Sequence, residues 1–135
     1  MNIELAYGEK GLTVDIPEKN LARVLKMKQQ PVLENPVQAI QDVLQHPCGS
    51  DSLAQLARDR SSACIVISDV TRPVPNSVIL PPLLETLEQN GIHRRDIVIL
   101  IATGIHRPNQ KEELRQLVGG EIADNYRIVN HFSRM

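Results

Sequence analysis

The stretch that decides the fold is Cys64-Ile65-Val66-Ile67-Ser68-Asp69-Val70-Thr71-Arg72-Pro73, and a second stretch repeats its design, Ile97-Val98-Ile99-Leu100-Ile101-Ala102-Thr103-Gly104-Ile105-His106-Arg107-Pro108. Each begins as a short, largely β-branched apolar run, which is typical of a buried strand, and ends in a polar cluster. A helical apolar pattern separates the two runs, so we expect parallel strands joined by a helix. In an open parallel sheet, ligands bind at the carboxyl ends of the strands. The two polar clusters are therefore predicted to share one edge of the sheet and to form the functional site.

The spacing of apolar residues predicts the other elements. Alternation around a glycine-containing loop indicates an antiparallel hairpin over residues 3–16, followed by an irregular connection over 17–35 with a short helix at 21–28. Four further helices are expected: one that starts at Pro36, one capped by Ser50 or Asp51, one around residues 79–87 and one capped by Asn109. The second of these should carry Arg58 and Arg60 in its last turn. A short helical turn is expected at residues 121–125. Strands are expected at 63–67, 96–102 and 126–130. This alternation predicts an α/β three-layer sandwich, Rossmann-like, with a mostly parallel sheet and an N-terminal antiparallel hairpin, all in a single domain over residues 1–135.

Composition excludes several classes of function. The 135 residues carry a formal net charge of -1 and only three aromatic side chains, which is unlike a nucleic-acid-binding surface. There is no apolar run of membrane-spanning length and no signal-peptide pattern at the start, so we expect a cytoplasmic protein that binds neither nucleic acid nor membrane. Cys48 and Cys64 are not spaced as a CxxC pair, and Cys64 is expected to be a buried thiol; no metal site is predicted.

The residue types in the two polar clusters favour recognition of a small anion. Arg72 offers a planar fork suited to carboxylate or phosphate, while Asp69 can orient that fork or bind a ligand hydroxyl. Two simpler interpretations stay open: Asp69 and Arg72 pair only with each other, or Asp69 and Thr71 merely shape the loop. In the second cluster, His106 follows Gly104 and can serve as a general base near neutral pH, although a loop histidine is often only a solvated hydrogen-bonding group.

The two motifs in order resemble the amino-terminal domain of the nickel-pincer-nucleotide lactate racemase family. The likeness rests on Ser-Asp-x-Thr-Arg-Pro at residues 68–73 and Ala-Thr-Gly-x-His-Arg-Pro at 102–108. It extends to the Pro-Cys-Gly-Ser turn at 47–50 and to the Arg-Ile-Val-Asn-His ending at 127–131. The resemblance covers essentially the whole chain.

That resemblance implies a 2-hydroxyacid racemase or epimerase, acting on lactate or a similar substrate, in which a hydride moves between the substrate carbon and a nickel-pincer nucleotide. It places His106 as a catalytic histidine that removes the hydroxyl proton. It also places Asp69, Thr71 and Arg72 beside cofactor and substrate, with Arg72 the better suited to meet an anionic group.

Family members are longer, and the resemblance puts their second catalytic histidine, the cofactor-bearing lysine and the nickel-ligating histidine beyond residue 135. We therefore expect this chain to hold part of a site, to be inactive alone and to bind no cofactor by itself. The alternative is a non-catalytic module that captures a phosphate or small carboxylate. Apolar surfaces left uncovered would favour a homodimer.

Overall fold

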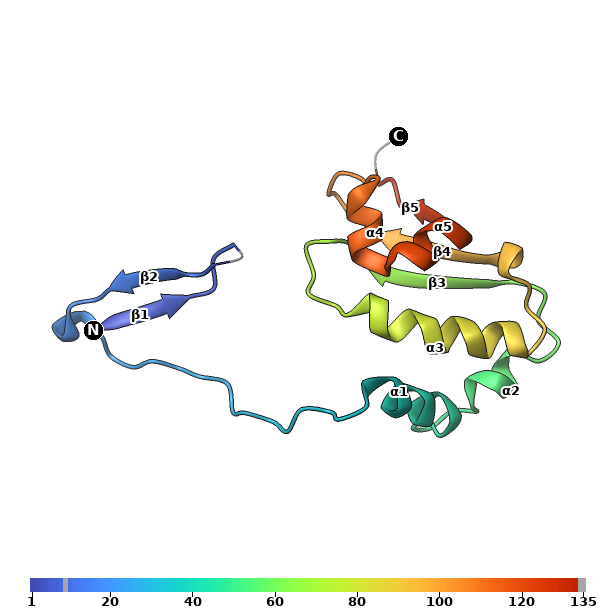
Figure 1. Ribbon diagram of the computed structural model, residues 1–135, viewed down its shortest axis with the longest axis horizontal. Helices are drawn as coiled ribbons and strands as arrows, with labels where there is room; N and C mark the ends of the chain where they lie inside the picture. Colours follow the sequence, from blue (N-terminus) through green and yellow to red (C-terminus); the bar gives the residue numbers. More distant parts are fainter. Residues whose placement is uncertain (9, 134–135) are drawn as a thin grey trace. The chain divides into compact units, whose positions relative to one another are not determined.

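The computed structural model describes residues 1–8 and 10–133 and divides the chain into two units, Met1–Val32 and Leu33–Met135 (Figure 1). In the first unit, strands β1 (Asn2–Leu5) and β2 (Leu12–Asp15) pair antiparallel, with Ile3 opposite Val14. The short 3-10 helix η1 (Glu18–Asn20) follows. The N-terminal hairpin predicted from the alternating pattern is confirmed.

The short helix predicted over residues 21–28 is wrong, because this segment is irregular. Leu25 and Met27 are 82% and 95% exposed, so the segment has no buried apolar face. A helix of two turns is not stable in water without such packing.

The second unit is built on a parallel sheet of three strands, β3 (Ala63–Ser68), β4 (Ile97–Ala102) and β5 (Arg127–Asn130), in the order β3-β4-β5. The register aligns Ile65 with Ile99, and Ile99 with Ile128. The α/β class, the parallel sheet and the N-terminal antiparallel hairpin are thus confirmed.

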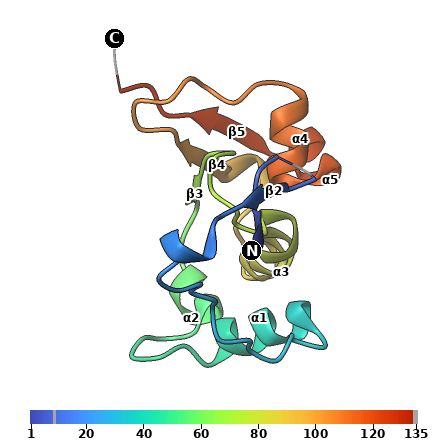
Figure 2. The same cartoon turned by 90° about the vertical axis from the view of Figure 1, so that its left-hand side faces the viewer.

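Helices of the second unit cover one face of this sheet (Figure 2). They are α3 (Asn76–Gln89), α4 (Glu112–Val118) and α5 (Gly120–Asn125), joined at one end by the short α2 (Leu53–Ala57), while α1 (Pro36–Gln45) packs against α3 and α2; the 3-10 helix η2 (Arg94–Asp96) lies between α3 and β4. Ile97, Ile99 and Ile101 of β4 are all 0% exposed and pack against α3, α4 and α5 in a single apolar cluster. This cluster fixes the central strand, and with it the loop that leaves its carboxyl end.

The opposite face of the sheet, which we call the open face, carries Cys64, Val66, Val98, Leu100 and Val129. Val66 is 62% exposed, and the lining of a shallow hollow of about 430 Å³ comes from the strands and the residues next to them. Within the described part of this unit, no helix packs on the open face. Cys64 is exposed, which corrects the expected burial: side chains alternate along a strand, and Cys64 points away from the face that buries Ile67.

Two helix starts differ from the sequence predictions. Ser52, and not Ser50 or Asp51, caps α2, because its hydroxyl and backbone form a reciprocal capping box with Gln55. The helix ends at Ala57, before the two arginines expected in its last turn. Helix α4 begins at Glu112 rather than just after Asn109, whose side chain is buried. No helix among the described residues has the length and apolar character needed to cross a bilayer.

Candidate functional site

The two polar clusters meet at the carboxyl end of the sheet. The β3–α3 loop (residues 69–75) starts with Asp69, and the β4–α4 loop (residues 103–111) contains His106. The Nδ1 atom of His106 lies 2.5 Å from the Oδ2 atom of Asp69, although the two residues are 37 positions apart in sequence. Parallel neighbours β3 and β4, paired with Ser68 opposite Ala102, bring both loops to the same edge.

Asp69 is a buried carboxylate with both oxygens engaged. Asp69 is only 4% exposed. The hydroxyl of Thr71 donates to Oδ1 at 2.6 Å and the Thr71 backbone N–H donates to the same oxygen at 3.2 Å, while Oδ2 faces His106. The hydrogen bond from Thr71, followed by that from His106, lowers the pKa of the Asp69 carboxyl below its usual value. Asp69 is therefore an ionised acceptor at neutral pH.

His106 is held on one side and exposed on the other. Its backbone N–H donates to the Thr103 carbonyl at 3.0 Å, which closes a turn that Gly104 permits with its positive φ of 58°. The side chain is 49% exposed. Among residues 1–8 and 10–133, the Nε2 atom has no hydrogen-bond partner. One ring nitrogen thus meets a fixed carboxylate, and the other is available to a ligand.

Arg72 and Arg107 behave differently, although each ends its motif before a proline. The Arg107 guanidinium forms two bonds to the Glu113 carboxylate of α4, at 2.8 and 2.5 Å, and lowers the pKa of Glu113 to about 2. Arg72 is exposed and takes part in none of the ion pairs among the described residues. Its backbone N–H donates to the Asp69 carbonyl at 3.1 Å, but the Asp69 carboxylate contacts Thr71 and His106 instead of the guanidinium. Of the two arginines, Arg72 is the one able to meet an anion.

Asn130, at the end of β5, holds the loop that carries His106, a role that sequence reasoning missed. Its side chain accepts from the backbone N–H of Asn109 at 2.8 Å and donates to the carbonyl of Asn109 at 3.0 Å. The Thr103 hydroxyl also donates to the carbonyl of His131, just beyond β5. The β4–α4 loop is thereby tied to β5 on both sides of His106. The only sequence signal was an amide side chain at the predicted carboxyl end of a strand.

Three buried polar side-chain atoms have no hydrogen-bond partner in the described part of the chain: Ser68 Oγ, Asn76 Nδ2 and Asn109 Oδ1. Ser68 ends β3, Asn76 begins α3, and Asn109 lies in the β4–α4 loop, so all three border the same two loops. Unpaired buried polar groups are uncommon and often accompany functional sites. The described residues bring no three His, Cys, Asp or Glu side chains together as ligands for a metal ion.

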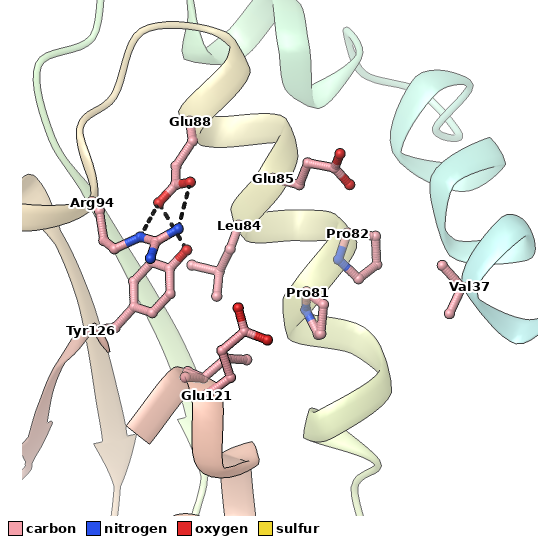
Figure 3. A pocket seen from close by; sticks show the side chains of 10 residues that line it. Val37, Pro81, Pro82, Leu84, Glu85, Glu88, Arg94, Glu121 and Tyr126 are labelled. Carbon is pink, nitrogen blue, oxygen red and sulfur yellow. Dashed lines mark hydrogen bonds and ion pairs between the residues drawn. The ribbon is translucent and has the colours of Figure 1, made fainter. Parts of the chain in front are cut away.

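A second hollow, of about 320 Å³, lies elsewhere and includes no residue of the two loops (Figure 3). Glu88 of α3 accepts from Arg94 at 2.7 and 3.1 Å and from the Tyr126 hydroxyl at 2.9 Å, and the Arg94 guanidinium lies 4.9 Å from the Tyr126 ring centre. These partners satisfy one another. The polar groups of this cluster are bonded to one another, whereas the imidazole of His106 keeps one ring nitrogen for a ligand.

Comparison with known proteins agrees with this geometry. The sequence profile of the lactate racemase N-terminal domain matches residues 7–135, which include both loops and β5. The chain belongs to the lactate racemase N-terminal domain family. This membership confirms the resemblance inferred from the two motifs.

Two lactate racemases are similar to this chain along nearly all of its length. It is 39% identical over 134 residues to the lactate racemase of Lactiplantibacillus plantarum, and 33% identical over 135 residues to that of Thermoanaerobacterium thermosaccharolyticum. The solved lactate racemase apoprotein of the latter organism superposes with a TM-score of 0.78 at 32% identity, over 99% of this chain. The chain spans about a third of the length of these relatives, 31% and 32% of the two sequences.

Proposed function

We propose that this chain supplies the proton-transferring part of a 2-hydroxyacid racemase or epimerase site, with lactate or a similar acid as substrate. The observation that carries the proposal is the half-exposed imidazole of His106 held by the buried carboxylate of Asp69, in a chain of the lactate racemase N-terminal domain family. An imidazole with one free nitrogen is suited to removing a hydroxyl proton near neutral pH. His106 is the catalytic residue of this proposal.

Arg72 has the role of meeting the substrate carboxylate or another anionic group. Its guanidinium has no ion-pair partner among residues 1–8 and 10–133, and its backbone is fixed by the turn to Asp69. A planar guanidinium can bind a carboxylate through two parallel hydrogen bonds. Thr71 contributes indirectly, because its hydroxyl is bonded to Asp69.

The remaining chemistry is expected from the parts of the longer lactate racemases that do not align with this chain. In the family, a nickel-pincer nucleotide supplies the acceptor for the hydride that leaves the substrate carbon. Among the described residues no three His, Cys, Asp or Glu side chains come together to hold a metal ion without a cofactor, and the part proposed for this chain is proton transfer and substrate binding. The unpaired polar atoms around the two loops are groups that a polar cofactor can satisfy. We expect no racemisation by the isolated chain.

The two structural units are proposed to work as one N-terminal domain. The family profile starts at residue 7, within the hairpin, and runs through residue 135, so it includes most of the first unit and all of the second.

A chimera tests the proposal directly. The segment of the Lactiplantibacillus plantarum lactate racemase that aligns with this chain is replaced by residues 1–135, and the interconversion of D- and L-lactate is measured in the cofactor-loaded protein. We expect activity in the chimera, and a fall in kcat of about 10²–10⁴-fold for His106→Gln, because the general base is removed. His93→Gln, at an exposed histidine before η2, is the matched control and should retain activity.

An active His106→Gln chimera would refute the catalytic role. A folded, cofactor-loaded chimera without activity would favour the second candidate, a module that binds phosphate or a small carboxylate through the exposed Arg72. Calorimetric titration of the chain with phosphate and with lactate then decides whether that module binds an anion.

A further inference from the structure

We infer that Asp69 is a positioning residue for His106 rather than a ligand-binding group: it holds the ring proton on Nδ1 and so leaves Nε2 as the atom that takes the substrate proton. The inference rests on the proposed function of His106 and adds to it the identity of the reacting nitrogen.

The first argument is that the Asp69 carboxylate is buried with both oxygens in contact with protein groups. Oδ1 accepts two hydrogen bonds from Thr71, at 2.6 and 3.2 Å, and Oδ2 lies 2.5 Å from the imidazole. The residue is 4% exposed, so a cofactor or substrate hydroxyl would have to displace one of these partners. The half-exposed imidazole is the part of this pair that a ligand can reach.

The second argument concerns the proton. An ionised carboxylate can only accept hydrogen bonds, and the contacts of Asp69 favour its ionised form. The Nδ1 atom of His106 must therefore be the donor in the contact between the two side chains. A neutral imidazole has a single N–H, so its Nε2 atom carries a lone pair. Carboxylates fix histidine tautomers in the same way in metal sites and in Ser-His-Asp enzymes.

The third argument is that the carboxylate itself is held still. Thr71 binds Oδ1 through both its hydroxyl and its backbone N–H, which sets the plane of the carboxylate before His106 meets it. The turn between the Arg72 N–H and the Asp69 carbonyl fixes the backbone on the other side. The orientation of the imidazole is thus determined by the β3–α3 loop, although His106 belongs to the β4–α4 loop.

The tautomer can be measured on the 135-residue chain without cofactor. The ring nitrogens of His106 are observed by ¹⁵N NMR in the neutral imidazole, with His106→Gln to assign the signals. We expect a protonated, pyrrole-type signal from Nδ1 and an unprotonated, pyridine-type signal from Nε2. The opposite assignment, with the proton on Nε2, would overturn the inference without any variant.

Two variants separate positioning from simple stability. Asp69→Asn should remove the strict preference for a proton on Nδ1, because an amide can donate to that nitrogen as well as accept from it. Thr71→Val, which leaves the Oδ2 contact in place, should keep the preference. Backbone amide spectra establish that each variant is folded. An unchanged tautomer in folded Asp69→Asn would contradict the assignment.

The chimera supplies the kinetic arm. Asp69→Asn should lower kcat by at least tenfold, and up to about the 10⁴-fold seen when the aspartate of a Ser-His-Asp triad is replaced by asparagine, while KM changes little. Equal activity of Asp69→Asn and the parent chimera would refute the positioning role while leaving that of His106 intact. An active His106→Gln chimera would instead refute the proposed function, whatever the tautomer.

Discussion

Asp69 and Glu88 each accept hydrogen bonds from two side chains, but the chemistry that these partners allow differs. Asp69 is bonded to a hydroxyl and an imidazole, and Glu88 is bonded to the Tyr126 hydroxyl and to Arg94. A guanidinium stays charged at all ordinary pH values, whereas an imidazole gains and loses a proton near neutrality. The Glu88 cluster can therefore only hold structure, while the Asp69 pair can take part in proton transfer.

The Glu88 cluster leads to a prediction for Tyr126. Burial of the phenol, together with the hydrogen bond to the negative Glu88, raises the pKa of Tyr126 to about 12, from its usual 10. A raised pKa means that the folded state favours the protonated phenol, so this contribution to stability is complete below pH 10 and is lost as the pH rises through about 12. Ultraviolet difference titration in a Tyr7→Phe background should show Tyr126 ionising near pH 12.

A matched pair of glutamates on α3 provides the control. Glu88→Gln removes the negative charge beside the phenol and should lower the pKa of Tyr126, whereas Glu85→Gln, in the same hollow but bonded to Gln89, should leave it in place (Figure 3). A wild-type midpoint at the ordinary value for tyrosine would show that the cluster does not form.

At the scale of elements, the strands and their loops could be predicted because period and position decide them. The two short, β-branched apolar runs favoured strands, and parallel strands bring their carboxyl ends to one edge, which is why Asp69 and His106 were expected at one site. The contact between these two side chains could not be predicted, since by sequence the nearby Arg72 was the candidate partner of Asp69. It depends on rotamers and on the turn at Gly104.

Helix ends, and the bonds by which Asn130 holds the β4–α4 loop, were also harder to predict, because they depend on contacts between side chains. Ser50, Asp51 and Ser52 are all good caps by residue type, and the reciprocal bond to Gln55 decides among them. The role of Asn130 needs knowledge of which loop lies beside β5. Cys64 was expected to be buried because it lies in an apolar strand, but the apolar run does not tell which face of the sheet the helices cover.

The two hydrogen bonds between the Asn130 side chain and the Asn109 backbone, which we call the clamp, should contribute to stability. Asn130→Ala leaves the backbone N–H and carbonyl of Asn109 without their partner in a partly buried loop, so we expect a loss of about 1–3 kcal/mol in the free energy of unfolding. Denaturant titration measures it. Asn125→Ala is the control: its side chain makes one exposed bond to the Glu121 carbonyl, and its removal should change the unfolding free energy by less than about 0.5 kcal/mol. Equal effects of the two substitutions would contradict the clamp.

At the scale of the whole molecule, the second unit is asymmetric about its sheet. One face of β4 is fully buried by helices, and the open face leaves Val66 62% exposed beside Leu100 and Val129. The curated lactate racemases that the chain matches are about three times as long. An apolar sheet surface of this kind favours association with other protein surface.

We expect the 135-residue chain to self-associate through this open face. Val66→Lys places a charge on the edge strand β3, on the open face, and should hold the chain as a monomer, as lysine does on natural edge strands. Val43→Lys is a matched control, because Val43 is 64% exposed but lies on α1, away from the sheet. Sedimentation velocity over a range of concentrations should give an average mass that rises for the wild type and for Val43→Lys and stays constant for Val66→Lys. If the wild type remains a monomer throughout, the open face does not drive association; if both lysine variants dissociate the dimer equally, the contact lies elsewhere.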